Sequence, residues 1–192
     1  SALTLLALLN LSPEKTWSQA EARLIDITPI MDFIRKYYAR EYAPNTRETL
    51  RRQSMHQFVA AAIALYNPDD WSRPVNSPKT VYQIELNTLT LLRAFGSNAW
   101  EASLQEYLAI SETLIARYAN HRQQQLIPVQ LASGQEIHLS PGEHSGLIKA
   151  IIEEFAPRFA PGSTLIYAGD TGDKWGYFDQ KLLADLGVTI DL

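Results

Sequence analysis

The sequence predicts a mixed α+β protein, in which helices dominate the first half and an α/β sheet begins in the second half. Two observations lead to this class. Before residue 126, apolar residues recur at helical spacing in several segments that open with helix-start signals. After residue 126, short apolar runs are bounded by glycine or proline, as is typical of strands. We therefore predict a first domain over residues 1–97, a connecting helix over 98–125 and a second domain over 126–192.

The composition restricts the class of protein further. The chain has 192 residues, enough for one large domain or two small ones. No apolar run approaches the ~20 residues that a membrane helix needs, so we expect no membrane partner. The sequence contains no cysteine, which excludes disulfides and thiolate zinc sites and fits a reducing, cytoplasmic location. The net charge of −4 does not by itself predict a nucleic-acid partner.

The first domain begins with a series of helical segments. Ser12-Pro13-Glu14 and Thr28-Pro29 are helix-start signals, because each places a capping hydroxyl before a proline at the first helical position. The predicted helices span Ala2–Asn10, Pro13–Ala22, Thr28–Arg40 and a longer stretch that begins at Thr46. The inward apolar face of the last stretch is formed by Leu50, Met55, Phe58, Val59 and Ala62.

A hairpin follows these helices. Ala64–Tyr66 and Thr80–Ile84 read as strands, and the loop "NPDDWSRPVNSPK" between them is rich in proline and aspartate. Helices followed by a hairpin give the order of a winged helix-turn-helix domain. The helix that begins at Thr46 then occupies the recognition position, whose N-terminal residues point into the major groove of DNA.

The charge distribution supports DNA contact at this helix. Between Arg35 and His56 the chain carries six lysines and arginines against two glutamates, inside an acidic protein. A solvated helix face is the plainer interpretation, and winged helices also serve as protein-interaction modules. Clustering, helix-start position and the following hairpin together favour DNA contact. The candidate DNA-binding residues are Asn45, Thr46, Arg47, Arg51, Arg52, Arg73 and Lys79.

The second half alternates helices and strands. The predicted segments are the helices Leu86–Phe95 and Asn98–Gln125, the hairpin Ile127–Leu131 with Glu136–Leu139, a helix from Glu143 that ends at Pro157, the strand Ser163–Ala168, the helix Phe178–Leu186 and the strand Val188–Leu192. Ser163–Ala168 is nearly all apolar, as expected for a strand buried on both faces. Two such strands and a hairpin rarely close a core. We therefore expect the C-terminal region to be truncated, or completed by another chain.

Two helices of this half have apolar faces, and we expect the face of the second helix to be buried. The face of the long helix is formed by Trp100, Leu104, Tyr107, Leu108, Ser111, Leu114, Ile115 and Tyr118. The face of the helix after Glu143 is formed by Leu147, Ile148, Ile151, Ile152 and Phe155.

The loop Gly169–Lys174 suggests either a phosphate site or a metal site. A P-loop needs two glycines separated by four residues and a Ser or Thr after the lysine, and neither condition is met. The carboxylates also lack the spacing of a calcium loop. A magnesium nuclease site needs carboxylates and often a lysine, and Asp170, Lys174 and the helix acids Glu143, Glu153 and Glu154 have that chemistry. From spacing alone, a structural turn in which Asp170 caps the next segment is favoured.

Long stretches of the chain resemble one protein family. They are "LTLLALLNL", "ITPIMDFIRKYYAREYAPNTRETLRRQSMHQF", "ALYNPDDWSRPVNSPKTVYQI", "LSPGEHSGLIKAIIEEFAPRFAPG" and "YAGDTGDKWGYFD". All look like type II restriction endonucleases of the BsuBI/PstI family. The resemblance implies an N-terminal winged-helix domain and a C-terminal PD-(D/E)xK nuclease domain, which cut a short palindromic site in double-stranded DNA with Mg²⁺. It also implies a homodimer, because the palindrome is cut symmetrically, and a cognate DNA methyltransferase as functional partner.

The sequence departs from this family in the nuclease motif. In the family, a Pro-Asp strand follows the region of Val188–Leu192 and a further acidic strand comes later, and neither is present here. Pro68-Asp69 lies in the hairpin and is not carried over. The residues carried over, as supporting groups at the edge of the site, are Glu143, Glu153, Asp170 and Lys174, with Asp170 the one candidate metal ligand. We therefore expect this chain alone to bind DNA without cutting it. The alternative is a non-enzymatic winged-helix DNA-binding regulator.

Overall fold

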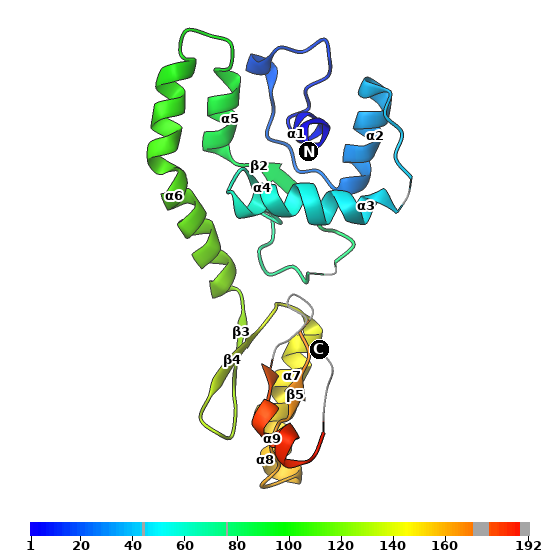
Figure 1. The fold of residues 1–192 in the computed structure, drawn as a ribbon, viewed down its shortest axis with the longest axis vertical. Coiled ribbons are helices and arrows are strands. Elements are labelled where there is room, and N and C mark those ends of the chain that lie inside the picture. The colour runs from blue at the N-terminus through cyan, green and yellow to red at the C-terminus, as the bar shows by residue number, and fades with distance from the viewer. Residues whose placement is uncertain (44, 76, 171–176, 189–192) are drawn as a thin grey trace. The chain divides into compact units, whose positions relative to one another are not determined.

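A computed structural model describes residues 1–43, 45–75, 77–170 and 177–188 and divides the chain into two compact units (Figure 1). Unit 1 comprises Ser1–Trp71 and Lys79–Arg122, and unit 2 comprises Ser72–Pro78 and Gln123–Leu192. Each unit buries a hydrophobic cluster of its own. Of the helices in the described ranges, none has the length and apolar character that a membrane crossing requires.

Unit 1 is mainly helical. Its elements are α1 (Ala2–Leu8), the 3₁₀ helix η1 (Trp17–Gln19), α2 (Ile27–Tyr38), α3 (Thr46–Thr49), the π-helical turn η2 (Leu50–Met55), α4 (His56–Ala60), β1 (Ala64–Tyr66), β2 (Tyr82–Ile84), α5 (Leu86–Arg93) and α6 (Trp100–Gln124). The core is apolar and fully buried at Leu8, Ile30, Ile34, Met55 and Ile84. These residues come from α1, α2, η2 and β2, so the core joins the helices to the hairpin.

The predicted helix over Pro13–Ala22 is wrong. The structure forms a single 3₁₀ turn there, at Trp17–Gln19. A capping box closes this turn, because the backbone N–H of Thr16 donates to the side chain of Gln19. The start signal at Ser12-Pro13 is present, but the residues that follow lack a repeating apolar face to bury. A start signal without such a face does not sustain a helix.

The helix that begins at Thr46 is confirmed, and it contains a π-helical turn. α3, η2 and α4 run on without a break from Thr46 to Ala60. Because a π turn bonds residues five apart, Leu50 and Met55 lie on one face and both are buried. The prediction of an inward face is confirmed here, with Phe58 and Val59 partly buried beside that core.

The predicted hairpin is also confirmed. β1 and β2 pair antiparallel, with Ala64 opposite Ile84 and Tyr66 opposite Tyr82. The predicted helices after it are present as α5 and α6. The apolar stripe of α6, however, is only partly buried, since Leu114 is buried whereas Leu108 is 54% exposed. α6 packs through the side of the helix that carries Tyr107 and Tyr118, because these side chains bond groups of the preceding helix and its cap.

Unit 2 combines two antiparallel strand pairs with helices. Its elements are β3 (Ile127–Gln130), β4 (Glu136–Leu139), α7 (Glu143–Ala150), the π-helical turn η3 (Ile151–Phe155), α8 (Ala156–Phe159), β5 (Tyr167–Ala168), β6 (Tyr177–Phe178) and α9 (Gln180–Asp185). β3 pairs with β4, as the predicted hairpin requires, and β5 pairs with β6. The core lies on the first hairpin, where Val129 and Leu139 are fully buried.

Three predictions for unit 2 are wrong. The helix does not end at Pro157 but continues to Phe159, because the π turn η3 comes directly before α8 and changes the backbone bonding there. The strand Ser163–Ala168 shortens to Tyr167–Ala168, and Tyr167 is about half exposed, so it is not buried on both faces. Of the predicted buried helix face, Ile148 and Ile152 contact the core. The other members of that face are exposed, namely Leu147, Ile151 and Phe155.

The C-terminal helix is confirmed, but it begins two residues later than predicted, because Phe178 lies in β6. α9 covers Gln180–Asp185, and the Asp179 side chain caps it by accepting a hydrogen bond from Leu182 N. Gly187 follows with a φ of 70°, which is the left-handed conformation that ends helices. Most of the strand predicted at Val188–Leu192 lies outside the described residues.

Candidate nucleic-acid interface

The basic residues predicted to bind DNA lie mainly on the continuous helical run Thr46–Ala60. Asn45 precedes the run and is exposed, and Thr46 is half-buried at its first position. Arg47 is about half exposed and pairs with Asp26, with 3.5 Å between its Nη2 and the carboxylate Oδ1. Since Asp26 caps α2, this ion pair connects the first turn of the run to the start of α2.

Glu48 joins the next two arginines. Its Oε1 accepts a hydrogen bond of 2.8 Å from Nε of Arg52, one turn further along. Its Oε2 lies 4.0 Å from Nη1 of Arg51. The two arginines differ in exposure, with Arg52 78% exposed and Arg51 33% exposed. One carboxylate therefore holds one arginine at the surface and contacts a second that lies closer to the core.

Arg51 also reaches the hairpin. Its guanidinium lies close enough to the phenol of Tyr82 on β2 to lower the pKa of that group. Burial raises the pKa of this phenol to about 12, and the nearby Arg51 charge opposes that rise. Tyr82 is therefore neutral at physiological pH and offers its oxygen as an acceptor. Arg51 thus lies near two groups, the carboxylate of Glu48 and a buried phenol.

Further cations surround this run on α2 and just beyond it. Arg35 pairs with Asp32 at 2.8 Å on α2. Lys36 lies 4.8 Å from the ring centre of Tyr37, and Arg40 lies 5.9 Å from that of Tyr42. The charged ends of Lys36 and Arg40 therefore lie over aromatic rings, in the arrangement of a cation–π contact. Unit 1 thus carries positive charge on two helices that contact each other.

The two DNA-binding residues predicted in the hairpin loop belong to different units. Lys79 belongs to unit 1 and is exposed shortly before β2. Arg73 belongs to unit 2 and is half-buried. Of the seven predicted DNA-binding residues, unit 1 therefore contains all except Arg73. Sequence reasoning did not single out Glu48 and Tyr82, although an acid three and four residues before two arginines is a readable signal.

Asp170 connects two loops of unit 2. Its Oδ1 accepts a 2.8 Å hydrogen bond from the backbone N of Ser140, and its Oδ2 accepts a 2.7 Å bond from the hydroxyl of the same residue. Ser140 is buried directly after β4, and Asp170 follows β5. The contact therefore joins the ends of two strands. The contact is structural, but it is not the cap of the following segment that the sequence suggested, because Ser140 lies 30 residues earlier in the chain.

The other predicted nuclease residues have separate surroundings. Glu153 accepts a 2.8 Å hydrogen bond from Gln130 N and lies 3.6 Å from the Lys149 ammonium. Lys149 also donates to the carbonyl oxygen of Pro128, at 2.6 Å. Together these two side chains provide hydrogen-bond partners for the backbone N–H of Gln130 and the carbonyl oxygen of Pro128 on β3. Glu143 is exposed at the start of α7. Lys174 lies outside the described residues.

A metal ion does not fit the acids that the structure describes. Within the described ranges, no three His, Cys, Asp or Glu side chains are close enough together to hold one. A divalent cation in a nuclease needs two or three convergent carboxylates. Asp170 uses both oxygens on Ser140, and Glu153 uses its oxygens on Gln130 and Lys149. No catalytic step through Mg²⁺ can be derived from these side chains.

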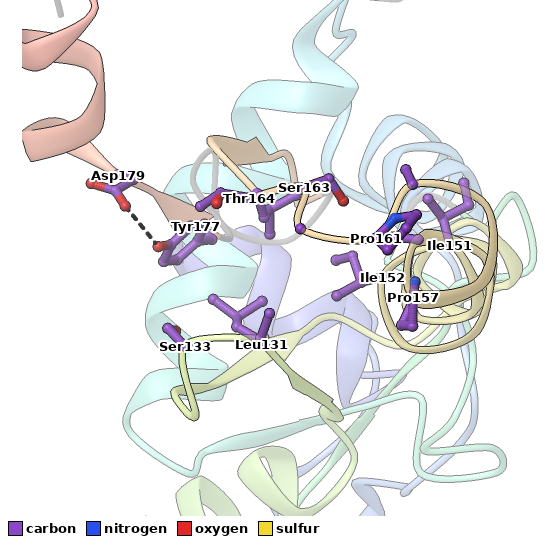
Figure 2. A pocket seen from close by; sticks show the side chains of 15 residues that line it. Leu131, Ser133, Ile151, Ile152, Pro157, Pro161, Ser163, Thr164, Tyr177 and Asp179 are labelled. Atoms are coloured by element: carbon purple, nitrogen blue, oxygen red, sulfur yellow. Dashed lines mark hydrogen bonds between the residues drawn. The ribbon is translucent and has the colours of Figure 1, made fainter.

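Unit 2 also contains a cavity of about 680 Å³ (Figure 2). Its wall is largely apolar, with Leu131, Ile152 and Pro157 among the lining residues. Tyr177 and Asp179 add polar groups, and their side chains are joined by a 3.4 Å hydrogen bond. Asp170 does not line this cavity. This cavity was not predicted, because apolar residues from separate segments carry no motif.

Comparison with known protein families identifies both parts of the chain. Residues 1–116 match a family described as the BsuBI/PstI restriction endonuclease HTH domain. Residues 127–192 match the BsuBI/PstI restriction endonuclease domain. The first match includes the whole basic helical run, and the second includes Asp170 and Glu153.

Individual relatives agree with these matches. The type II restriction enzyme BsuBI of Bacillus subtilis is 62% identical over 191 residues, which are 100% of this chain and 60% of that protein. The type II restriction enzyme AplI of Arthrospira platensis is 34% identical over 190 residues, 97% of this chain and 58% of that protein. The solved structure of SdaI restriction endonuclease matches with a TM-score of 0.56 and 34% identity, covering 100% of this chain and 60% of that one. The chain spans about three-fifths of the length of these relatives.

Proposed function

The chain belongs to the BsuBI/PstI restriction endonuclease family, and we propose that it is the DNA-binding part of a type II restriction endonuclease with a portion of the nuclease domain. The observation that carries this proposal is the position of the basic helical run. Thr46–Ala60 lies inside the segment that matches the family's HTH domain, and it carries Arg47, Arg51 and Arg52. The chain covers about 60% of the length of its relative BsuBI, so the DNA cleavage performed by a whole restriction enzyme is proposed for the intact protein and not for this chain.

We propose that unit 1 binds DNA as a winged helix. In this arrangement Thr46–Ala60 is the recognition helix and the β1–β2 hairpin is the wing. Arginines near the start of a recognition helix reach guanine O6 and N7 in the major groove. Other exposed cations and amide groups bind the phosphates of the DNA backbone and so set the orientation of the protein on the duplex. Arg51 and Arg52 suit the first task. Backbone contacts of unit 1 fall to Asn45, Thr46, Arg47 and Lys79, and Arg73, which belongs to unit 2, is proposed as a further backbone contact. The domain boundaries proposed for this arrangement stay at residues 1–97, 98–125 and 126–192.

For the intact enzyme we propose Mg²⁺-dependent cleavage of both strands of a short palindrome by a homodimer, in the cytoplasm, with a DNA methyltransferase as functional partner. Mg²⁺ would supply charge stabilisation and an activated water. Among the residues of this chain, Glu143, Asp170, Glu153 and Lys174 have supporting roles in that proposal. Since the described acids do not form a metal site, we expect the 192-residue chain to bind duplex DNA without cutting it.

Selection from a random pool tests the binding proposal. The purified chain is incubated with random duplexes, and bound molecules are recovered, amplified and sequenced. We expect the recovered duplexes to converge on one short palindrome. Recovery of unenriched sequences at every round would contradict site-specific binding.

Digestion of a plasmid that carries the selected site tests the expectation that this chain binds DNA without cutting it. With Mg²⁺ present, we expect the 192-residue chain to leave the plasmid intact. Linearisation at the site would show that the chain holds a complete catalytic centre. The matched control is the same plasmid with the site mutated, which separates site-specific cutting from contaminating nuclease.

A further inference from the structure

Glu48 is an acid placed among the cations of the helical run. Its carboxylate is about half exposed and accepts from Arg52 Nε at 2.8 Å, while Arg51 Nη1 lies 4.0 Å from its other oxygen. On a surface that binds phosphates, a negative charge is unfavourable, because it repels the DNA backbone. The position of Glu48 therefore needs an explanation other than affinity for DNA.

The contacts of Arg51 and Arg52 suggest that explanation. A free arginine side chain samples many rotamers, and ordering it on binding costs conformational entropy. Before DNA arrives, Glu48 hydrogen-bonds Arg52 at 2.8 Å and forms an ion pair with Arg51 at 4.0 Å, and Arg51 also lies close enough to Tyr82 on the hairpin to influence the pKa of its phenol. The guanidiniums are thus presented in a defined direction. A base edge needs a bidentate donor in one geometry, whereas a phosphate accepts donors from many directions.

We infer that Glu48 is a positioning residue that makes the helical run selective for sequence, by holding Arg51 and Arg52 in the orientation that reads base edges and by weakening their attraction to phosphates. Glu48 itself need not touch DNA in this role. The inference rests on the proposed function, since it presupposes that the helical run binds duplex DNA.

Glu48→Gln tests this role, because glutamine keeps the length of the side chain and removes its charge. Binding is measured by fluorescence anisotropy at several salt concentrations, on the duplex selected by the parent chain and on a scrambled duplex of equal length. We expect the variant to bind the scrambled duplex about threefold to tenfold more tightly, with a salt slope steeper by about one. The preference for the selected duplex should fall by about tenfold.

Asp32→Asn is the matched control. Asp32 pairs with Arg35 on α2 at 2.8 Å, and its exposure is close to that of Glu48, at 55% against 51%. This control removes one exposed charge and frees one arginine outside the helical run. We expect the preference for the selected duplex to stay at the parent value.

The possible outcomes separate the inference from the proposed function. If Glu48→Gln changes the affinity for both duplexes by the same factor, or changes neither, the positioning role is wrong while site-specific binding stands. An equal loss of preference in Asp32→Asn would also overturn the role, because the effect would then belong to surface charge in general. A parent chain with no preference between duplexes would contradict the proposed function itself.

Discussion

The carboxylate of Asp170 bonds both the backbone N–H and the hydroxyl of Ser140. Hydrogen bonds to an ionised acceptor are about twice as strong as those between neutral groups. The side chain therefore fixes the junction between the ends of β4 and β5 in unit 2. Its sequence context, with glycines and a second aspartate nearby, is equally typical of a metal loop, so only the three-dimensional contacts reveal the structural role.

Asp170→Asn should loosen this junction. Asparagine keeps one acceptor oxygen but turns an NH₂ group toward the second donor, so one of the two bonds is lost at a cost of about 1–3 kcal/mol. We expect hydrogen exchange at the Ser140 amide to accelerate roughly tenfold to a hundredfold. Asp185→Asn, at an exposed position in the last turn of α9, is the control and should leave this rate unchanged. Unaltered exchange in Asp170→Asn would contradict the structural role.

Tyr82 should make the stability of unit 1 depend on pH in the alkaline range. Burial raises the pKa of its phenol to about 12, whereas the unfolded chain ionises near 10. The folded state therefore retains a proton that the unfolded state loses. The resulting stabilisation is present in full below pH ~10 and is lost as pH rises toward ~12, by about 2–3 kcal/mol.

The measurement compares urea unfolding of the parent chain and Tyr82→Phe between pH 9 and 12, as far as reversibility allows. Other tyrosines and lysines titrate in both proteins, so the difference between the two pH profiles isolates Tyr82. We expect the free energy of unfolding to fall less steeply in Tyr82→Phe. Parallel profiles would mean that the phenol titrates alike in the folded and unfolded chains.

At the scale of elements, α5 depends on a buried acidic cap. Glu85 is only 2% exposed and accepts hydrogen bonds from the backbone N–H groups of Asn87 and Thr88. It also accepts from the hydroxyl of Tyr118 on α6, at 3.2 Å. A second bond between the helices joins Thr88 to Tyr107 at 3.0 Å. One carboxylate thus caps α5 and ties it to the long helix α6, which lies beside α5 (Figure 1).

Glu85→Ala should destabilise unit 1. The substitution leaves two backbone donors and a phenol without their acceptor in a buried position, which costs about 2–4 kcal/mol. Urea denaturation followed by tryptophan fluorescence measures this change. Glu101→Ala, an exposed acid in the first turn of α6, should shift the midpoint little. Equal midpoints for Glu85→Ala and the parent would show that the cap does not stabilise the fold.

Most helices and two of the three antiparallel pairs in the described residues could be predicted from the sequence, because their signals are local, whereas β5–β6 was not predicted. The helical run from Thr46 and the antiparallel pairs β1–β2 and β3–β4 follow from periodicity and turn residues within each segment. The failures depend on information that is not local. The helix at Pro13–Ala22 had a start signal but no face to bury. The continuation through Pro157 depends on a π turn, for which no sequence pattern was available.

The candidate DNA-binding site, like the fold, was predicted only in part. The arginines of the helical run were found, because charge clustering is visible in one dimension. Their partners were not, since Tyr82 lies about thirty residues after Arg51 and approaches it only when β2 pairs with β1. The burial of the apolar face after Glu143 was overestimated at Leu147, Ile151 and Phe155, because periodicity shows which residues share a face. It does not show whether another element covers that face.

At the scale of the whole molecule, the chain separates into a helical unit that carries most of the predicted DNA-binding residues and a second unit that matches the restriction endonuclease domain. The overall charge of −4 opposes association with DNA, so binding depends on where the positive charge lies. The central claim is that Arg47, Arg51 and Arg52 on Thr46–Ala60 form the contact with DNA. That claim concerns three side chains among 17 lysines and arginines.

The salt dependence of duplex binding tests this claim most directly. Each lost phosphate contact lowers the slope of log K against log salt by about 0.9. Replacement of Arg47, Arg51 and Arg52 by alanine should therefore reduce the slope by about one, through the phosphate contact of Arg47, and abolish the preference for the selected site, because Arg51 and Arg52 are the proposed readers of base edges. The control replaces three exposed cations elsewhere, Arg117, Arg158 and Lys181, and should keep both the preference and most of the slope. A triple arginine variant with the slope and preference of the parent would show that the helical run does not contact DNA.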